Sequence, residues 1–401
     1  MPRRRQRRRF PFMLSSSLVV VIVATVSVFG TIGFCQGFVT ADYSSAQRGS
    51  YKHLCSSGRK LPSLPLFLAS ASSSPTAAGA ELIDGKAIAQ TIRQELKEQV
   101  EAMSEQGKPT PGLAVILVGS RRDSQTYVNM KKKACAQVGV ESFGYDYDET
   151  VTQQELLDQI KKLNDNNQVH GILVQLPLPS HIDETAILTA VNPEKDVDGL
   201  HPENVAKLAT QGTHGAKAGY WQDLSSIPFS VPCTPLGCLE LLDRSGVEIK
   251  GKHAVIIGRS DLVGLPVSFL LLHRDATVTI VHSKSESIAS IVSQADIVVA
   301  AVGKAGLVKD DWIKDGAVVI DVGINSVDLP PEQVQEGKKT YKLVGDCDFD
   351  SCSQKASKIT PVPGGVGPMT IAMLLRNTVN ACQRSASSSS KEEQQVLVKQ
   401  P

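Results

Sequence analysis

The sequence predicts an α/β fold with two domains, each built on a largely parallel sheet. Three short apolar runs, residues 113–118, 172–174 and 255–258, have the unbroken hydrophobic pattern of strands that are covered on both faces. Segments with helical periodicity separate these runs, and alternating strands and helices indicate parallel βαβ units. The chain has 401 residues and is 41% hydrophobic, which is enough to build two cores.

Composition and charge exclude several classes of function. The net charge is +1 and aromatic residues make up 5% of the chain, so neither electrostatics nor base stacking favours a nucleic-acid partner. The eight cysteines are scattered, without a CxxC pair and without histidines at zinc-ligand spacing. We therefore expect no metal site and no disulfide framework, and we interpret Cys233 and Cys238 as small apolar residues.

The first 80 residues differ from the rest and are expected to be a targeting leader outside the fold. An arginine-rich start at residues 3–9 precedes an uncharged apolar run at 14–34, and residues 37–80 are rich in serine and alanine with Asp42 as their only acid. This order is typical of a signal segment followed by a transit segment, which favours a plastid surrounded by extra membranes. Two alternatives stay open: a mitochondrial presequence, and a membrane anchor if the apolar run is retained.

Two helices of the first domain have clear limits. Apolar residues at every fourth position over residues 88–100 predict an amphipathic helix, which Pro109 breaks. Further along, Thr152 and Glu155 have the spacing of a capping box, which opens a helix that ends in the asparagine-rich turn at residues 164–167.

A third helix carries the first candidate site. Asp123 or Ser124 can cap its start, and Gly139 is placed to end it. Tyr127 and Lys131 are four residues apart, so they share one helix face. An aromatic plane beside an amine suits a flat, ionisable heterocycle, but the pair read alone also fits a half-buried tyrosine beside a solvated lysine.

Polar residues of the first domain follow its strands. Gln175 comes directly after a predicted strand, at the edge where parallel sheets bind ligands. Asp196 and Asp198 lie on a loop that Gly199 closes, and in an extended loop they would point to the same side. Either can present a carboxylate to a ligand, or the loop is a plain Asx turn. Residues 210–226 are interpreted as a surface insertion.

The second domain begins with a strand, a glycine turn and a helix, as in a Rossmann unit, although GxGxxG is absent. Gly258 can form the turn, Gly264 can let helix and strand pack closely, and the helix start offers N–H groups to a phosphate. The strand Thr277–Val281 ends in His282-Ser-Lys-Ser285, where an NAD-binding unit usually has an acid. Together with Arg259, this end favours a 2′-phosphate and hence NADP.

Two further strands, at residues 297–301 and 318–322, are expected to continue this sheet. They end at Gly303 and at Gly323-Ile-Asn325, and both ends are positioned to border a dinucleotide.

The last informative stretch is Thr360-Pro-Val-Pro-Gly-Gly-Val-Gly-Pro-Met-Thr370. Its three glycines permit close backbone approach, and Pro368 suits the first turn of a helix. We expect that helix over residues 369–381 and a disordered tail over 386–401.

Five motifs, in order along the chain, carry a resemblance to one family. They are Tyr127-x-x-x-Lys131, Gln175-Leu-Pro-Leu-Pro, Lys195-Asp-Val-Asp-Gly, Gly258-Arg-Ser-x-x-Val-Gly-x-Pro and Pro361-Val-Pro-Gly-Gly-Val-Gly-Pro. Residues 81–385 resemble the bifunctional methylenetetrahydrofolate dehydrogenase/methenyltetrahydrofolate cyclohydrolase family. The resemblance implies oxidation of 5,10-methylenetetrahydrofolate with NADP⁺ to the methenyl cation, hydrolysis of that cation to 10-formyltetrahydrofolate, and a homodimer.

The resemblance also divides the chain into domains. It implies a folate-binding catalytic domain over residues 81–226, completed by a C-terminal helix at 369–385. An NADP-binding Rossmann-like domain would then cover residues 227–368, with the active site in the cleft between the two domains.

Roles of single residues are implied by the same resemblance. Tyr127 should stack on the folate, and Lys131 should be essential to hydrolysis. Gln175 should hold Lys131, while Asp198, the second acid of its motif, should anchor the pterin. Further substrate-binding residues would be Leu176, Pro177, Pro363, Gly364 and Gly365. Cofactor-binding residues would be Gly258, Arg259, Ser260, Gly264, His282, Ser283, Gly303, Ile324 and Thr360, and no metal is implied.

Two alternative functions stay open. One is a monofunctional dehydrogenase without cyclohydrolase activity, in which we would expect Lys131 to be replaced. The other is a folate- or dinucleotide-binding protein without turnover, against which the intact set of Tyr127, Lys131, Gln175 and Asp198 speaks.

Overall fold

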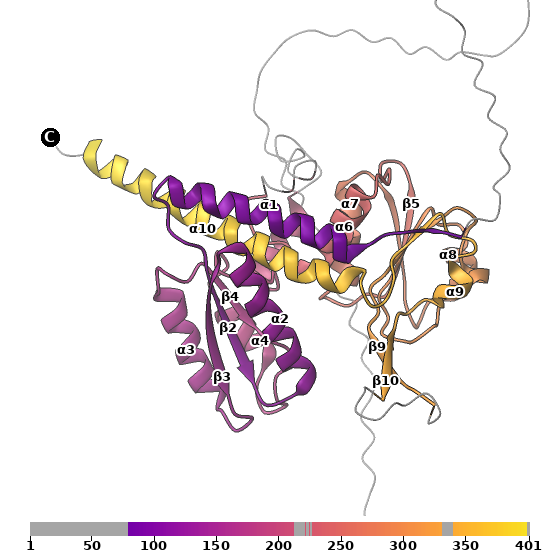
Figure 1. The fold of residues 1–401 in the computed structure, drawn as a ribbon, viewed down its shortest axis with the longest axis horizontal. Coiled ribbons are helices and arrows are strands. Elements are labelled where there is room, and N and C mark those ends of the chain that lie inside the picture. Colours follow the sequence, from indigo (N-terminus) through magenta and orange to yellow (C-terminus); the bar gives the residue numbers. More distant parts are fainter. Residues whose placement is uncertain (1–78, 212–220, 222–223, 225–226, 331–339, 399–401) are drawn as a thin grey trace, which may run out of the picture. The chain divides into compact units, whose positions relative to one another are not determined.

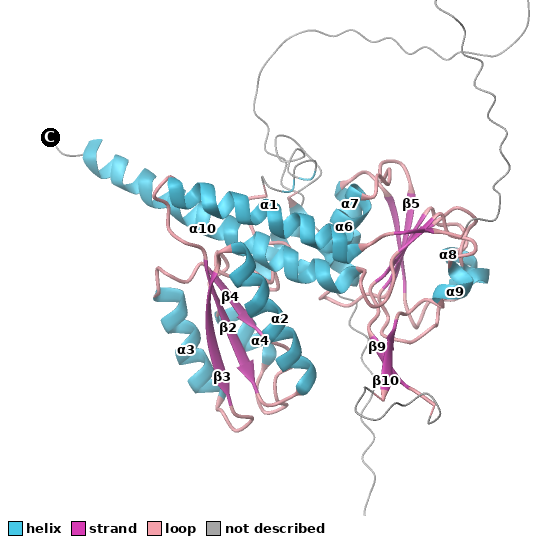
Figure 2. Cartoon of the chain, in the orientation of Figure 1, coloured by secondary structure: helices cyan, strands magenta, loops and turns pink. Residues whose placement is uncertain are grey.

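The described part of the chain forms two parallel sheets with helices packed beside them. The computed structural model describes residues 79–211, 221, 224, 227–330 and 340–398, so the expected leader lies outside it except at its last two residues. Within these residues one sheet has three strands, another has six, and two more strands form a hairpin (Figures 1 and 2). This arrangement confirms the predicted two-domain α/β fold.

The three-stranded sheet has β2 (Gly112–Val118) at its centre, and every residue of β2 is buried. It pairs in parallel with β4 (Gly171–Val174), and both strands confirm predicted apolar runs. On its other side lies β3 (Glu141–Tyr147), which the sequence did not predict. This strand is at the edge of the sheet and alternates between exposed and half-buried residues, so it has no continuous apolar pattern.

The helices of this domain begin at polar caps, with one exception. The side chain of Asp84 caps α1 (Gly85–Glu105), and the predicted capping box opens α3 (Gln153–Asp165). The predicted cap of α2 (Arg122–Val138) was wrong. That helix begins earlier, so its N-cap is Arg121, without a side-chain cap bond, and Asp123 and Ser124 lie in the first turn. Gly139 ends it at a φ of +84°, as predicted.

Two long helices lie side by side. α10 (Val366–Val398) packs along α1 and α6 (Cys233–Arg244), and both α6 and α10 begin three residues before their predicted starts (Figure 1). Pro368 is therefore in the first turn of α10, as expected. The prediction of a disordered tail was wrong through Val398, because the helix continues there. Extending an existing helix costs less than nucleating a new one, so a serine- and lysine-containing segment can remain helical.

An ion-pair network joins these three helices. Glu240 of α6 is buried and pairs with Arg376 of α10 and with Arg244. Arg244 in turn pairs with Glu95 of α1 at 2.7 Å. The network ties α10, at Arg376, to α6 and α1.

The six-stranded sheet has the order β1-β11-β8-β7-β5-β6 and is parallel throughout. The predicted strands are present as β5 (His253–Ile257), β6 (Thr277–Val281), β7 (Ile297–Ala300) and β8 (Val318–Asp321). The glycine turn after β5 leads into α7 (Gly264–His273), as expected. Further short helices in the described part of the chain are α4 (Glu184–Ala190), α5 (Pro202–Thr210), α8 (Ile288–Val292), η3 (Asp310–Trp312) and α9 (Phe349–Cys352).

Four short strands were not predicted. β1 (Glu81–Leu82) and β11 (Lys358–Ile359) extend the six-stranded sheet, so the first described strand pairs with the second domain rather than the first. β9 (Asn325–Asp328) and β10 (Tyr341–Val344) form the antiparallel hairpin. Strands of two to four residues give too little periodicity to be recognised in a sequence.

The predicted surface insertion at residues 210–226 falls mostly outside the described residues, but Trp221 shows that part of it is buried. Its side chain is 0% exposed and stacks on His273 with 4.6 Å between ring centroids. Its Nε1 donates to the carbonyl of Gln211 at 3.1 Å. The interpretation of the whole segment as surface was therefore wrong at this residue.

The described cysteines are all buried free thiols, and Cys35 and Cys55 lie outside the described residues. Among the described residues no cluster of His, Cys, Asp and Glu could hold a metal ion. No described helix is long and apolar enough to cross a membrane, and residues 14–34 are outside this search.

Candidate active site

A cavity of about 370 Å³ brings together the four residues predicted to be catalytic. Tyr127 and Lys131 reach it from one face of α2, Gln175 directly follows β4, and Asp198 lies on the loop before α5. The remaining walls come from the start of α6, the turn before α7, the residues after β8 and the first two turns of α10. Elements of both predicted domains therefore line one cavity, and Leu176 and Ile324 are also in its walls.

Lys131 brings an amine to the wall of this cavity. Its Nζ donates a hydrogen bond of 2.9 Å to Oε1 of Gln175, whose own Nε2 donates to the carbonyl of Leu176 at 2.9 Å. The lysine is 9% exposed, and burial lowers the pKa of its amine, while the charge of Asp198 opposes this shift. The amine is thus held in one orientation and shifted toward its neutral form.

The pKa of Asp198 is shifted in the opposite direction from that of Lys131. Burial raises the pKa of its carboxyl, the nearby Lys131 ammonium acts in the opposite direction, and Asp196 adds to the rise. Desolvation therefore favours the neutral form of both Lys131 and Asp198, whereas their mutual attraction favours the charged forms. A cationic or strongly polar ligand beside Lys131 and Asp198 can change the balance between their charged and neutral forms.

Asp196 and Asp198 have different partners. The two were expected to point to the same side only in an extended loop, and residues 197–199 bend instead. The carboxylate of Asp196 accepts hydrogen bonds from the N–H groups of Gly199 at 3.1 Å and His201 at 2.8 Å, and from Nδ2 of Asn204 at 2.9 Å. The loop turns at Gly199, which has a φ of +73°, instead of staying extended. Asp196 thus holds the loop through N–H groups three and five residues further on, while Asp198 faces the cavity.

Cys233 was interpreted as a small apolar residue, but the structure places it in the wall of the cavity. It is the first residue of α6, and its thiol donates to the carbonyl of Val197 at 3.3 Å. Burial and the neighbouring Asp198 carboxyl raise the pKa of the thiol well above its usual value, so it remains protonated. The signal that could have revealed it is Pro232-Cys-Thr-Pro235, which places the cysteine at a helix start.

The glycine turn after β5 has the close packing that was predicted. Gly258 has a φ of +123°, and a Cβ there would lie 2.2 Å from the carbonyl oxygen of Ala301. A Cβ on Gly264 would lie 2.5 Å from the carbonyl oxygen of Gly258. The hydroxyl of Ser260 accepts hydrogen bonds from the N–H groups of Val263 at 3.2 Å and Gly264 at 3.4 Å, so it caps the start of α7.

Exposed polar groups lie at the same edge of the six-stranded sheet. The N–H of Gly258 donates to Val281, which brings the end of β6 beside the turn that carries Arg259. Arg259 and Ser283 are exposed, and the ring Nδ1 of His282 accepts from the N–H of Lys284 at 3.2 Å. The cation and hydroxyl expected to face a 2′-phosphate are therefore accessible to a ligand.

Two domains of one known family match the two parts of this fold. Residues 83–198 match the tetrahydrofolate dehydrogenase/cyclohydrolase catalytic domain, and residues 232–386 match the NAD(P)-binding domain of the same family. The chain belongs to the tetrahydrofolate dehydrogenase/cyclohydrolase family. This finding confirms the resemblance of the five motifs.

Several curated relatives and solved structures of this family are similar over nearly their whole length. Bifunctional protein FolD 2 of Arabidopsis thaliana is 56% identical over 305 residues, which are 76% of this chain and 96% of the relative. Bifunctional protein FolD 4, chloroplastic, of the same plant is 52% identical over 76% of this chain and 80% of its own length. The FolD structure from Trypanosoma brucei, complexed with NADP cofactor and inhibitor, is 46% identical with a TM-score of 0.69, covering 77% of this chain and 99% of that one.

The other substrate residues predicted for this tetrahydrofolate dehydrogenase/cyclohydrolase lie beside the cavity wall rather than in it. Pro177 follows Leu176, and Pro363, Gly364 and Gly365 directly precede Val366 at the start of α10. The backbone of Gly365 packs against Gly85, because a Cβ on Gly85 would lie 1.9 Å from its carbonyl oxygen.

Thr360 does not present its side chain to a ligand. It is 1% exposed, and its hydroxyl accepts a hydrogen bond of 2.7 Å from the N–H of Asp321. The hydroxyl joins the ends of β8 and β11, so the predicted contact of Thr360 with the cofactor would have to come from its backbone. Gly303 lies after β7, and its N–H donates to Asp346 at 2.9 Å.

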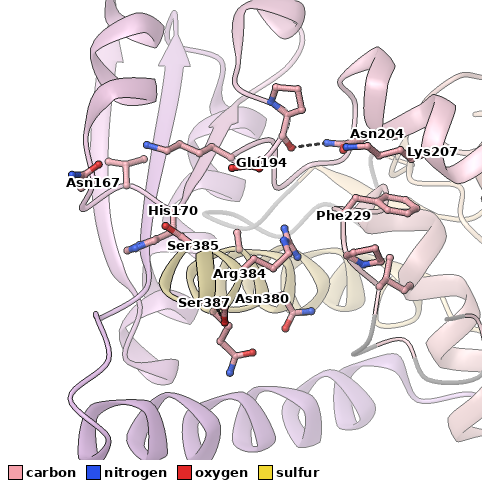
Figure 3. Close-up of a pocket in the computed structure, with 17 residues that line it drawn as sticks. Asn167, His170, Glu194, Asn204, Lys207, Phe229, Asn380, Arg384, Ser385 and Ser387 are labelled. Carbon is pink, nitrogen blue, oxygen red and sulfur yellow. Dashed lines mark hydrogen bonds between the residues drawn. The ribbon is translucent and has the colours of Figure 1, made fainter. Parts of the chain in front are cut away.

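A larger cavity of about 500 Å³ lies elsewhere in this family member, and none of the predicted site residues lines it. Side chains of α5 and α10, among them Lys207 and Asn380, surround it (Figure 3). The amine of Lys195 donates to three backbone carbonyls, at 2.7–3.1 Å, and Lys207 pairs with Glu203 at 2.7 Å. These two cations therefore have protein partners.

Proposed function

We propose that the cavity containing Lys131 carries out both reactions of the family. The first is the NADP-dependent oxidation of 5,10-methylenetetrahydrofolate to 5,10-methenyltetrahydrofolate, and the second is hydrolysis of the methenyl compound to 10-formyltetrahydrofolate. The observation that carries this proposal is the hydrogen bond between Lys131 and Gln175 inside a cavity that Tyr127 and Asp198 also line. A monofunctional dehydrogenase would not need a lysine held in this way.

Hydrolysis is the step that this chain's own side chains perform. The methenyl carbon is electron-poor and carries positive charge, so a positive ammonium beside it is disfavoured. Since burial already lowers the pKa of Lys131, its amine can take a proton from the attacking water. Gln175 holds that amine by its Oε1, which fixes the direction of the nitrogen lone pair.

Oxidation depends on alignment. When bound, NADP⁺ accepts a hydride from the methylene carbon of the folate. Tyr127 stacks on the folate ring and Asp198 accepts hydrogen bonds from the pterin, so the same folate pose serves both reactions. Leu176, Pro177, Pro363, Gly364 and Gly365 complete the substrate site in this proposal.

The NADP site is proposed at the carboxyl ends of β5 to β8. Gly258, Ser260 and Gly264 let the pyrophosphate approach the start of α7, while Arg259, His282 and Ser283 face the 2′-phosphate. Gly303 and Ile324 border the dinucleotide further along the sheet edge. The Trypanosoma brucei relative, which is complexed with NADP, supports this choice of cofactor.

The test measures both reactions with the purified protein. NADPH formation from methylenetetrahydrofolate and NADP⁺ reports oxidation, and loss of the methenyl absorbance reports hydrolysis. Oxidation without hydrolysis would identify a monofunctional dehydrogenase. Binding of folate and NADP⁺ without either turnover would identify a binding protein and would contradict the proposal.

Delivery to an organelle is proposed from residues 1–80, with a plastid favoured over a mitochondrion. The chloroplastic relative of Arabidopsis thaliana supports a plastid. Fusing these residues to a fluorescent protein in cells with both organelles tests this choice, and fluorescence in mitochondria would contradict it.

Domain limits and assembly are also proposals. We place the folate domain at residues 81–226 with the helix segment 369–385, and the NADP domain at 227–368. We expect a homodimer, which light scattering of the purified protein can test; a monomeric mass would contradict it.

A further inference from the structure

A buried aspartate in the second domain holds the loop that follows β7. Asp346 is 0% exposed, and one of its carboxylate oxygens accepts hydrogen bonds from the N–H groups of Val302 at 2.6 Å and Gly303 at 2.9 Å. Its other oxygen accepts from the N–H of Lys304 at 2.8 Å. Three consecutive amides thus converge on one side chain, which fixes the backbone path of that loop.

The same carboxylate also holds the residues that follow β8. Nδ2 of Asn325 donates to Asp346 at 2.9 Å, and Asn325 directly follows Ile324 in the wall of the active-site cavity. Gly323 packs directly on the carboxyl group, because a Cβ at Gly323 would lie 2.3 Å from it. Asp346 therefore sits between two loops at the carboxyl edge of the sheet, where α/β proteins bind their ligands.

A second buried aspartate holds Asp346 in turn. Asp321 is 3% exposed and accepts hydrogen bonds from the N–H groups of Gly323 at 3.0 Å, Asp346 at 2.9 Å and Cys347 at 2.8 Å. Burial raises the pKa of Asp321 to about 6, and the backbone N–H groups oppose that rise. Among the described residues, neither carboxylate has a lysine or arginine within salt-bridge distance.

The carboxylates of Asp321 and Asp346 accept hydrogen bonds from amides and, in the part of the chain that the structure describes, do not pair with cations, so their role is not charge pairing. A buried carboxylate is costly to desolvate, and a fold can be held together more simply by apolar packing. What the two carboxylates provide is direction, because the N–H groups of residues 302–304, the N–H of Gly323 and the side-chain amide of Asn325 must each point at a fixed oxygen. These loops carry Gly303 and Ile324.

We propose that Asp346 is a positioning residue for the dinucleotide, which sets the two loops that border the nicotinamide half of the cofactor through Gly303 and Ile324. This inference rests on the proposed NADP site. The competing reading is a structural anchor that stabilises the second domain without any specific effect on the cofactor. Measuring both activities distinguishes a positioning role from a structural anchor. Hydrolysis needs Lys131 and folate but does not consume NADP⁺, so a change in cofactor positioning alone should spare it.

The test compares Asp346→Asn with Asp350→Asn in the full-length protein. Both replace a carboxylate by an amide of the same shape, but Asp350 is exposed on α9. Calorimetric titration gives the Kd of NADP⁺, and assays with supplied substrates give kcat for oxidation and for hydrolysis. We expect Asp346→Asn to raise the Kd of NADP⁺ about tenfold or more, with hydrolysis changed less than about twofold, because charge-assisted bonds to the cofactor loops alone are weakened. Asp350→Asn should change none of these values.

Two results would overturn the inference. One is an unchanged Kd of NADP⁺ in folded Asp346→Asn, and the other is an equal loss of both activities with a lower Tm, as expected for a structural anchor. If Asp346→Asn does not fold, Asn325→Ala decides, because it removes one donor to the same carboxylate. It should weaken NADP⁺ binding several-fold, and an unchanged Kd would overturn the inference. A wild-type protein that binds NADP⁺ without forming NADPH would contradict the proposed oxidation, while its Kd values would still test Asp346.

Discussion

Lys131 on α2 donates a hydrogen bond of 2.9 Å to Gln175, which follows β4, and this bond crosses from a helix to the edge of the sheet beside it. Because Gln175 also donates to the carbonyl of Leu176, its amide cannot rotate freely. The lysine is therefore held by an acceptor that is itself fixed. A neutral acceptor leaves the lowered pKa of Lys131 in place, whereas a carboxylate here would raise it.

Lys131→Met should abolish hydrolysis and leave some oxidation, since methionine fills similar space but cannot accept a proton from water. The matched control is Lys132→Met, because Lys132 is on the same helix and lies near Asp146, outside the cavity. Assays of both activities check this prediction. Hydrolysis at the wild-type rate in Lys131→Met would show that another group is the base.

Gln175→Glu should move the pH dependence of hydrolysis toward higher pH. A carboxylate keeps the acceptor for Lys131 but adds a negative charge at 2.9 Å, which favours the ammonium and raises the pKa of the amine. Since the neutral amine is the active form, hydrolysis near pH 7 should fall and recover as the pH rises. Rate measurements over pH 6–9 check this, and a profile that does not move would argue against Lys131 as the base.

Arg259→Ala should reduce the preference for NADP⁺ over NAD⁺. Losing one charge-assisted contact with a phosphate typically costs about 1.5–3 kcal/mol, which is roughly tenfold or more in affinity. The kcat/KM values for the two cofactors give the preference, and Lys250→Ala is the control because its side chain is 81% exposed and pairs with Asp275 after α7. Equal use of both cofactors by the wild type would contradict the assignment.

Buried strands and the capping box of α3 could be predicted from the sequence because each depends on local chemistry. β2 and β4 are continuous apolar runs, and Thr152 with Glu155 forms its capping box within four residues. The edge strand β3 could not be predicted, because its solvated face carries no apolar pattern. Caps were predictable only where the helix start was correct, as the shifted start of α2 shows.

Site residues were predictable where a motif carries them, and not where tertiary contacts define their role. The five motifs supplied Tyr127, Lys131, Gln175 and Asp198, which the structure brings into one cavity. Asp346 has no helical or strand periodicity around it that would reveal a role. Its importance comes from amides 42 to 44 residues earlier in the chain, so only the fold brings donor and acceptor together.

Asp196 and Asp198 give the sharpest test of the site, because they are two residues apart and have separate partners. Asp196→Ala leaves the N–H groups of Gly199 and His201 without an acceptor and removes one of the two acceptors of the Asn204 amide, which should cost about 1–3 kcal/mol of unfolding free energy. Asp198 makes no comparable set of backbone bonds among the described residues and lines the cavity beside Lys131.

Asp198→Ala should therefore keep the fold and impair both activities, since both reactions use one folate pose. The pterin donors would lose their acceptor in a closed site, a loss of about 1–3 kcal/mol or more. Asp196→Ala should lower Tm and retain folate binding in the molecules that remain folded. Folate affinity, both activities and Tm, measured in the two variants, check the assignment. If Asp196→Ala loses folate binding while Asp198→Ala keeps it, the carboxylate that holds the pterin is Asp196, and the loop that it holds is then part of the substrate site.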